Sequence, residues 1–440
     1  MNKIFLLVLF LISQCKTIAQ QNQTNDQIKV MDGFPPSRES QVTFENYRTH
    51  PYSQWSFRNI GAPLHVLMMP RSGAVHSFKE LPDKSISNFP TVDTDGKSST
   101  FENIFKDFYA DGVIVIKDNS VKYENYWNGL SRDYQHIWFS ITKSLTSSAI
   151  GLLVEQKKLD LSASPVQYIP ELKGSAYERA TIQDVLNMST ALGFKENYVD
   201  STSFFWKYYA SSMNFFYSPN KEPNPKTSEV YGTFDFLAKK ATINQEMKPG
   251  YMFEYNSSNA DVAGWLISRI SGKPYADFIR DNVWSKIGAD HDAYLVADRA
   301  YMGVATGGMN TTLRDAALFG NLILNKGKVD GKQIFPAQWV DETLKLTKED
   351  KDRYARNDVY TKAGLPWVAY KNFWWILDEI KGEYCGVGIH GQMIYINRSA
   401  NMVIAYFSSQ PAASSASAGG FKPFVSKLNA CRELAKSRSK

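Results

Sequence analysis

Apolar and polar positions between residues 112 and 127 predict a β-hairpin. Val113–Ile116 is a β-branched apolar run, and Asp118-Asn119-Ser120 supplies residues typical of a turn. From Val121 to Trp127 apolar and polar residues alternate, as expected for a strand with one buried face. Because the connection is so short, the two strands must run antiparallel.

A second pair of strands is predicted near the C-terminus. Gln392–Ile396 and Met402–Phe407 are apolar-rich runs that flank a polar turn at 397–401. A helix follows from about 421 to 435 and closes the chain. Between the two strand regions, Asn259–Ile270 has the periodicity of an amphipathic helix.

Strands near both ends with helices between them indicate an α+β fold. We expect one domain over 100–435, in which an antiparallel sheet is flanked by helices. A mostly helical subdomain should occupy about 165–290. The substrate cleft should lie where the sheet and this subdomain meet.

Residues 1–19 are expected to form a signal peptide. The unbroken apolar run Ile4–Ile12 follows a basic residue, and Thr17-Ile18-Ala19 offers small residues for cleavage. The run is too short to span a bilayer as a helix. The mature protein should therefore be exported, periplasmic or secreted, with no membrane span. Lipoprotein anchoring at Cys15 is the alternative, although Gln14 stands where a small residue is expected.

Residues 20–99 are rich in Pro, Ser, Asn and Asp, and we expect an extended arm that packs on the body with little regular structure. Two cysteines remain beyond the leader, Cys385 and Cys431. An exported location permits a disulfide, but sequence alone leaves pairing and free thiols equally open.

Charge and composition exclude several classes of partner. The formal net charge of +6 is mild and scattered, so no nucleic-acid partner is expected. The six histidines are dispersed without a zinc-binding pattern, which argues against a metal. Phosphate-binding glycine motifs are also absent, so we expect no cofactor and a small-molecule partner. The oligomeric state stays open.

The candidate chemistry centres on Ser140-Ile141-Thr142-Lys143 at the start of a predicted helix. Residues three apart on a helix share a face, so the Lys143 amine can reach the Ser140 hydroxyl. A serine hydroxyl becomes a good nucleophile when a neighbouring base takes its proton. Lysine can serve as that base once burial or nearby positive charge lowers its pKa. The helix N-terminus would also stabilise an oxyanion.

The sequence around this motif resembles the serine β-lactamase and penicillin-binding protein superfamily. Within it, the chain is most similar to class C-like esterases and to 6-aminohexanoate-dimer (nylon-oligomer) hydrolases. The resemblance runs from about 100 to 430. The resemblance also includes connecting segments outside the motif: Leu159–Leu161 with Val166–Leu172, Thr181–Thr190 and Gly307–Asp315.

The resemblance implies that Tyr255 is a second catalytic group, the general base and acid of a Tyr-x-Asn motif. Here Ser257 stands in the third position, a Tyr-x-Ser variant similar to the nylon-oligomer hydrolases, and is expected on the substrate side. A lysine ammonium beside Tyr255 should lower the pKa of its hydroxyl. Lys143 and Tyr255 would then titrate as a coupled pair.

A third motif, Lys-Thr-Gly in the superfamily, falls on Gly386-Val387-Gly388 when the glycines are aligned. The Ile389 N–H would then complete the oxyanion hole with the Ser140 N–H, and Gly388 would lie against substrate. A register shifted by three makes Gln392 the donor instead. We favour the first register because glycines permit a close approach of backbone to substrate. Both registers lack the motif's lysine, which argues against penicillins as the main substrates.

Substrate contacts are expected from the middle of the chain. Tyr198 matches a substrate-side tyrosine of the nylon-oligomer hydrolases by its spacing from the nucleophile, and the aromatic run Phe204–Tyr209 could form a wall of the cleft. His390 should lie near the site, either as a hydrogen-bonded strand residue or as a substrate contact.

These features predict a serine hydrolase that cleaves small esters or linear amides through an acyl-enzyme on Ser140. Two alternatives stay open. One is a DD-peptidase or β-lactamase, and the other is a non-catalytic binding module of the same fold.

Overall fold

The computed structural model describes residues 28–215, 230–413 and 421–439. The predicted signal peptide at 1–19, including Cys15, lies outside these described residues. Within them, no helix combines the length and the apolar character that crossing a membrane would require.

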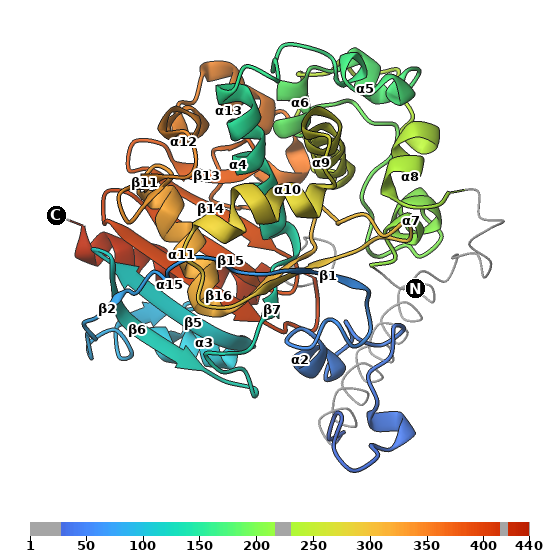
Figure 1. Cartoon of the computed structure of the whole chain (residues 1–440). Coiled ribbons are helices and arrows are strands. Elements are labelled where there is room, and N and C mark those ends of the chain that lie inside the picture. The colour runs from blue at the N-terminus through green and yellow to red at the C-terminus, as the bar shows by residue number, and fades with distance from the viewer. Residues whose placement is uncertain (1–27, 216–229, 414–420, 440) are drawn as a thin grey trace, which may run out of the picture.

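The main sheet is built from the two ends of the body, as the sequence predicted (Figure 1). The predicted hairpin forms, and the C-terminal pair of strands joins it, so that Tyr406 lies opposite Val113. Within the described chain the sheet has eight strands, and all pair antiparallel except β2 with β6. Their order is β12 (Ala369–Lys371), β13 (Trp374–Asp378), β14 (Glu383–Gly388), β15 (Gln392–Asn397), β16 (Met402–Ser408), β5 (Ala110–Lys117), β6 (Ser120–Tyr126) and β2 (Lys79–Glu80).

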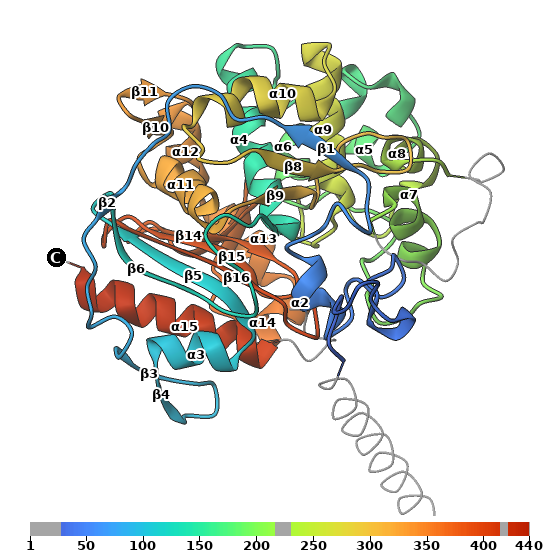
Figure 2. The ribbon, with the colours of Figure 1, turned by 60° about the horizontal axis from the view of Figure 1, so that its bottom comes forward.

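Helices cover both faces of this sheet, and because its strands pair almost entirely antiparallel the fold is α+β. Figure 2 shows α15 (Phe421–Arg438) and α3 (Phe101–Asp107) lying together along one face. On the other face, α11 (Leu313–Leu324) packs over β16, β15 and β5. Strands β5 and β16 are therefore buried almost throughout, which explains their nearly continuous apolar sequences.

The middle of the chain is mostly helical, as predicted. The expected amphipathic helix is α9 (Ser258–Ser271), which packs against α4 (Thr142–Glu155). The other helical segments of the described middle region are η3 (Pro165–Gln167), η4 (Pro170–Leu172), α5 (Ala176–Arg179), α6 (Ile182–Leu186), the π-helix η5 (Phe205–Ala210), α7 (Ser211–Met213), α8 (Thr233–Lys240), α10 (Tyr275–Asn282) and η6 (Trp284–Lys286). Three further helices, α12 (Ala337–Leu344), α13 (Lys348–Ala355) and α14 (Asp358–Lys362), precede β12.

The N-terminal arm holds more regular structure than its composition indicated. Its β1 (Val66–Met69) pairs with β8 (Ala293–Val296) in a second sheet, where β9 (Met309–Thr311) and β7 (His136–Ile137) follow. The arm's β1 lies at the edge of this sheet, next to strands from the body. The arm also contains η1 (Arg38–Ser40), α2 (Tyr52–Ser56), the β3–β4 hairpin (Pro90–Val92 and Ser98–Thr100) and β2. Outside the arm, strands β10 (Lys328–Val329) and β11 (Lys332–Gln333) form a separate hairpin.

The turn that presents Ser140 is fixed between the two sheets. It is a 3-10 turn, Phe139–Ile141, directly before α4. The Trp138 N–H donates to Met309 O at 2.8 Å and the Trp138 indole to Thr311 Oγ1 at 2.8 Å. Phe139 has a φ of 47°, a strained conformation for a residue with a side chain.

Strand β14 approaches this turn so closely that only glycine fits. A Cβ on Gly388 would lie 2.2 Å from the Trp138 carbonyl oxygen. A Cβ on Gly386 would meet Ser144 Oγ at 3.1 Å. The glycines therefore bring the end of β14 against the Ser140 turn.

Candidate active site

Ser140 and Lys143 face each other at the start of α4. Lys143 Nζ lies 2.7 Å from Ser140 Oγ and donates to the Thr306 carbonyl oxygen at 2.7 Å. The Lys143 side chain is buried. The spacing of three residues therefore places the two groups on one face of the helix start, as expected.

Burial changes the chemistry of Lys143. Loss of solvent lowers the pKa of its ammonium to about 8, and the negative charges of Glu196 and then Asp261 oppose part of that shift. A substantial fraction of the amine is therefore neutral near pH 8. A neutral amine beside a hydroxyl can accept its proton.

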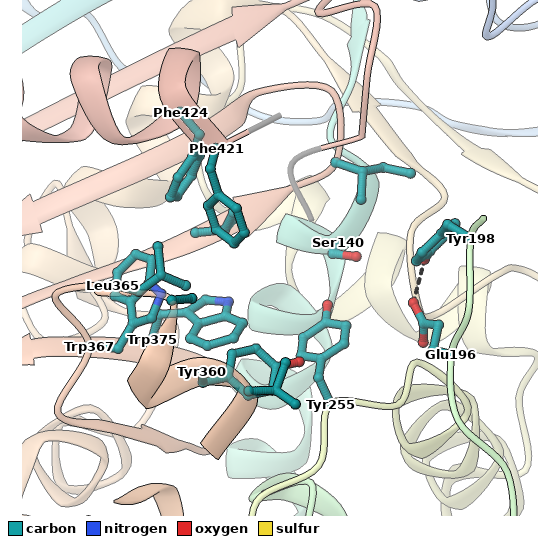
Figure 3. Close-up of a pocket in the computed structure, with 14 residues that line it drawn as sticks. Ser140, Glu196, Tyr198, Tyr255, Tyr360, Leu365, Trp367, Trp375, Phe421 and Phe424 are labelled. Atoms are coloured by element: carbon teal, nitrogen blue, oxygen red, sulfur yellow. Dashed lines mark hydrogen bonds between the residues drawn. The ribbon is translucent and has the colours of Figure 1, made fainter. Parts of the chain in front are cut away.

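Tyr255 reaches the same point from the segment before α9. Figure 3 shows its hydroxyl pointing toward Ser140. Its ring lies under Lys143 Nζ, 5.3 Å from the centroid, and stacks on Trp375 at 5.6 Å.

The expected lowering of the Tyr255 pKa is wrong. Burial, and after it the negative charge of Glu196, raises the pKa of the Tyr255 hydroxyl well above its ordinary value. The side chains of Ser140 and Ser257 beside the hydroxyl lower that pKa only in part. Tyr255 is therefore a protonated donor at neutral pH, while the neutral amine is the better base.

Glu196 is the site residue that the sequence analysis missed. It accepts hydrogen bonds from the Ser257 N–H at 2.6 Å, from Ser257 Oγ at 3.1 Å and from the Tyr198 hydroxyl. Figure 3 shows Glu196 and Tyr198 together on one side of Ser140. Glu196 lies 61 positions before Ser257 in the sequence. A separation of that length does not show whether two residues are in contact, so no sequence pattern marks Glu196 as part of the site.

Two backbone N–H groups beside the nucleophile are candidates for the oxyanion hole. Ile389 follows β14 directly and lines the cavity together with Ser140. In the part of the chain that the structure describes, the N–H groups of Ser140 and Ile389 donate to no backbone acceptor. This geometry agrees with the first register, since Ile389 lines the cavity with Ser140, whereas Gln392 lies in β15 opposite Gly388 and is not among the described lining residues.

His390 does not lie where a substrate contact would. Its ring is buried, Nδ1 is 2.7 Å from the Gln410 carbonyl oxygen, and Phe57 and Phe139 pack against it. Burial lowers the pKa of this imidazole to about 3. It is a structural residue, because the turn after β14 directs its side chain into the core. Gly388 likewise meets Trp138 and is absent from the described lining of the cavity.

A cavity of about 260 Å³ opens at Ser140. Tyr198 lines it, as predicted, but the run Phe204–Tyr209 does not supply its aromatic wall. Most of that run lies in η5, where Phe205 is buried in the core; Tyr209 is also buried but lines a second, small cavity beside Ser140 and Lys143. The wall comes from the C-terminal third instead: Tyr360, Leu365, Trp367, Trp375, Phe421 and Phe424 (Figure 3).

Other chemistry receives no support among the described residues. No cluster of three or more His, Cys, Asp or Glu side chains there could hold a metal ion. Cys385 and Cys431 are buried free thiols, so the question left open by the sequence is answered against a disulfide.

The fold and the nucleophile turn define a protein of the penicillin-recognising serine class. Residues 101–420 match the family model described as Beta-lactamase, and the chain belongs to that family.

Known proteins similar to this chain cover most of its length. The 6-aminohexanoate-dimer hydrolase of Paenarthrobacter ureafaciens is 26% identical over 86% of this chain and 91% of its own. A solved Bacillus anthracis protein, provisionally assigned as a 6-aminohexanoate-dimer hydrolase, is 26% identical with a TM-score of 0.78, over 92% of this chain and 98% of its own. A Bacteroides dorei structure provisionally assigned as a β-lactamase shares the fold, at 17% identity and a TM-score of 0.59, over 76% of this chain and 96% of its own.

The pKa of Lys143 predicts how Ser140 reactivity depends on pH. The rate at which a fluorophosphonate labels Ser140 should rise with pH around a midpoint of about 8, because the neutral amine is the base. Glu196→Gln removes a negative charge that raises this pKa, so the midpoint should move to lower pH. Intact-mass spectrometry across a pH series measures both.

Glu254→Gln is the matched control for that experiment. Glu254 is next to Tyr255 in sequence, but its carboxylate pairs with Lys195 at 3.5 Å. The pH midpoint of Ser140 labelling in Glu254→Gln should stay at the wild-type value. An unchanged or raised midpoint in Glu196→Gln would contradict the electrostatic account.

Proposed function

We propose that this protein is a serine hydrolase that cleaves small carboxylic esters or linear amides through an acyl-enzyme on Ser140. The observation that carries the proposal is the 2.7 Å contact between Ser140 Oγ and a buried amine whose pKa is lowered to about 8. The 6-aminohexanoate-dimer hydrolase relatives, which cover most of the chain, support the same class of reaction.

Acylation requires three events at this site. Lys143 Nζ takes the proton of Ser140 as Oγ bonds to the carbonyl carbon. The N–H groups of Ser140 and Ile389 hold the oxygen that becomes negative. The bond to the leaving alcohol or amine then breaks as Tyr255 donates its proton to the departing atom, and the proton held by Lys143 restores the Tyr255 hydroxyl.

Deacylation repeats the sequence with water as the nucleophile. Water loses a proton to the same pair of groups, attacks the acyl carbon and releases the carboxylic acid with free Ser140. Tyr198 and Ser257 line the substrate side, and Glu196 holds both in place. No step uses a cofactor.

The two alternatives account for the site less well. Penicillins and peptide C-termini carry a carboxylate, but no Lys or Arg stands among the described residues that line the main cavity. A non-catalytic binding module has no need for a buried lysine against a serine, an arrangement whose desolvation cost contributes nothing to binding.

We also propose that the protein works outside the cytoplasm. The apolar run and small residues within 1–19 support a cleaved signal peptide and a periplasmic or secreted enzyme. Mass spectrometry of the N-terminus of the mature protein tests this, and a lipidated Cys15 would indicate anchoring instead.

Turnover of model substrates tests the proposed reaction. The purified protein should hydrolyse p-nitrophenyl acetate, and Ser140→Ala should lose activity by about 10³-fold or more because the nucleophile is gone. Nitrocefin should be a poor substrate. Efficient nitrocefin turnover with little esterase activity would favour the β-lactamase alternative, and a folded but inactive wild type would favour the binding module.

The proton-donor role of Tyr255 predicts a dependence on the leaving group. Tyr255→Phe should slow hydrolysis of an amide or alkyl ester by about 10²–10⁴-fold, because those leaving groups need a proton. It should slow p-nitrophenyl acetate far less, since p-nitrophenolate departs without one. Steady-state kinetics on an ester pair with the same acyl group gives the comparison. Equal losses on both substrates would contradict the assignment.

A further inference from the structure

The cavity at Ser140 has two unlike sides. One side consists of Tyr360, Leu365, Trp367, Trp375, Phe421 and Phe424, which we call the aromatic subsite. The other side carries Tyr198 and Glu196, joined by a hydrogen bond. Figure 3 shows the Ser140 hydroxyl between the two sides.

The aromatic subsite is preformed by contacts among its own rings. The Trp375 ring lies 5.2 Å from Trp367 and 4.8 Å from Tyr370, and Trp367 lies 6.1 Å from Phe424. Trp367 and Phe424 are buried, so the wall is anchored in the core. A rigid apolar wall of this kind binds apolar groups without first paying to order its side chains.

The two sides of the cavity also differ in charge. Among the described lining residues Glu196 is the one with an ionisable carboxylate, and it lies away from the aromatic subsite (Figure 3). The described aromatic subsite contains no charged side chain. An ionised group placed there would lose hydration without gaining an opposite charge.

The polar side suits the leaving group. A departing alcohol or amine must meet the Tyr255 proton. The Ser257 side chain interacts with Tyr255 and donates a hydrogen bond to Glu196, which links Tyr255 to the polar side. The acyl group, which stays on Ser140, then faces the aromatic subsite.

We propose that the aromatic subsite selects substrates with an uncharged, apolar acyl group of several carbons, aliphatic or aromatic, and rejects acyl groups that end in a carboxylate. This proposal rests on the proposed function and names its substrate class. The carbonyl carbon is held at Ser140, and the acyl chain extends along Trp375 toward Trp367 and Phe424. Each methylene that leaves water for this wall strengthens binding of the transition state.

A series of p-nitrophenyl esters tests the proposal. From acetate through butyrate to hexanoate, kcat/KM should rise by about three- to fourfold per methylene. The mono-p-nitrophenyl ester of adipic acid has the same chain length as the hexanoate with a terminal carboxylate. Its kcat/KM should be more than tenfold below that of the hexanoate, because its charge finds no partner.

The Ala363→Phe variant tests whether the aromatic subsite selects the acyl chain. Ala363 is exposed and lines the cavity at the end of α14, so a larger side chain can narrow the subsite without disturbing the core. The ratio of hexanoate to acetate kcat/KM should fall by roughly tenfold. Lys362→Phe adds the same ring one position earlier, where the side chain is exposed and outside the described cavity lining, and should keep the wild-type ratio.

The outcomes separate this proposal from the proposed function. If no ester is cleaved through Ser140, the proposed function fails. If acetate is cleaved but longer chains give no gain, or Ala363→Phe leaves the ratio unchanged, the aromatic subsite does not select the acyl group. Equal rates for hexanoate and the adipate monoester would also overturn the inference.

Discussion

The site depends on the burial of one lysine side chain away from solvent. Lys143 is buried, and its Nζ finds Ser140 Oγ and the Thr306 carbonyl oxygen within hydrogen-bond distance. This environment disfavours the charged form, while the carboxylates of Glu196 and Asp261 pull its pKa back toward the ordinary range. The balance leaves a base that is neutral at mildly alkaline pH and still basic enough to take a serine proton.

Everything around that amine is positioned by the fold. Helix geometry sets Lys143 one turn after Ser140, but the rest of the site comes from distant parts of the chain. The antiparallel sheet brings β14 against the nucleophile turn, and the missing Cβ of Gly388 lets Ile389 lie beside Ser140. Glu196 ties the Tyr198 segment to Ser257, so the polar side of the cavity is held by one carboxylate.

Local patterns predicted four strands of the main sheet, the helices near 259–270 and 421–435 and the α+β class, because alternation and helical periodicity report directly on burial. The Ser140–Lys143 pair was predictable for the same reason, since a spacing of three is a local constraint. Glu196, the aromatic subsite and the position of His390 were not, because each depends on contacts between segments far apart in sequence. The prediction for the Tyr255 pKa was wrong for a related reason: burial and the negative charge of Glu196, which no local pattern reveals, raise that pKa.

The central claim is that Ser140 carries the acyl group. Intact-mass spectrometry of the protein, quenched in acid during turnover of p-nitrophenyl hexanoate, tests it most directly. The account predicts a covalent hexanoyl adduct that maps to Ser140, that is absent in Ser140→Ala and that decays once substrate is exhausted. Ester turnover that persists in Ser140→Ala, or an adduct that maps to another residue, would contradict the account.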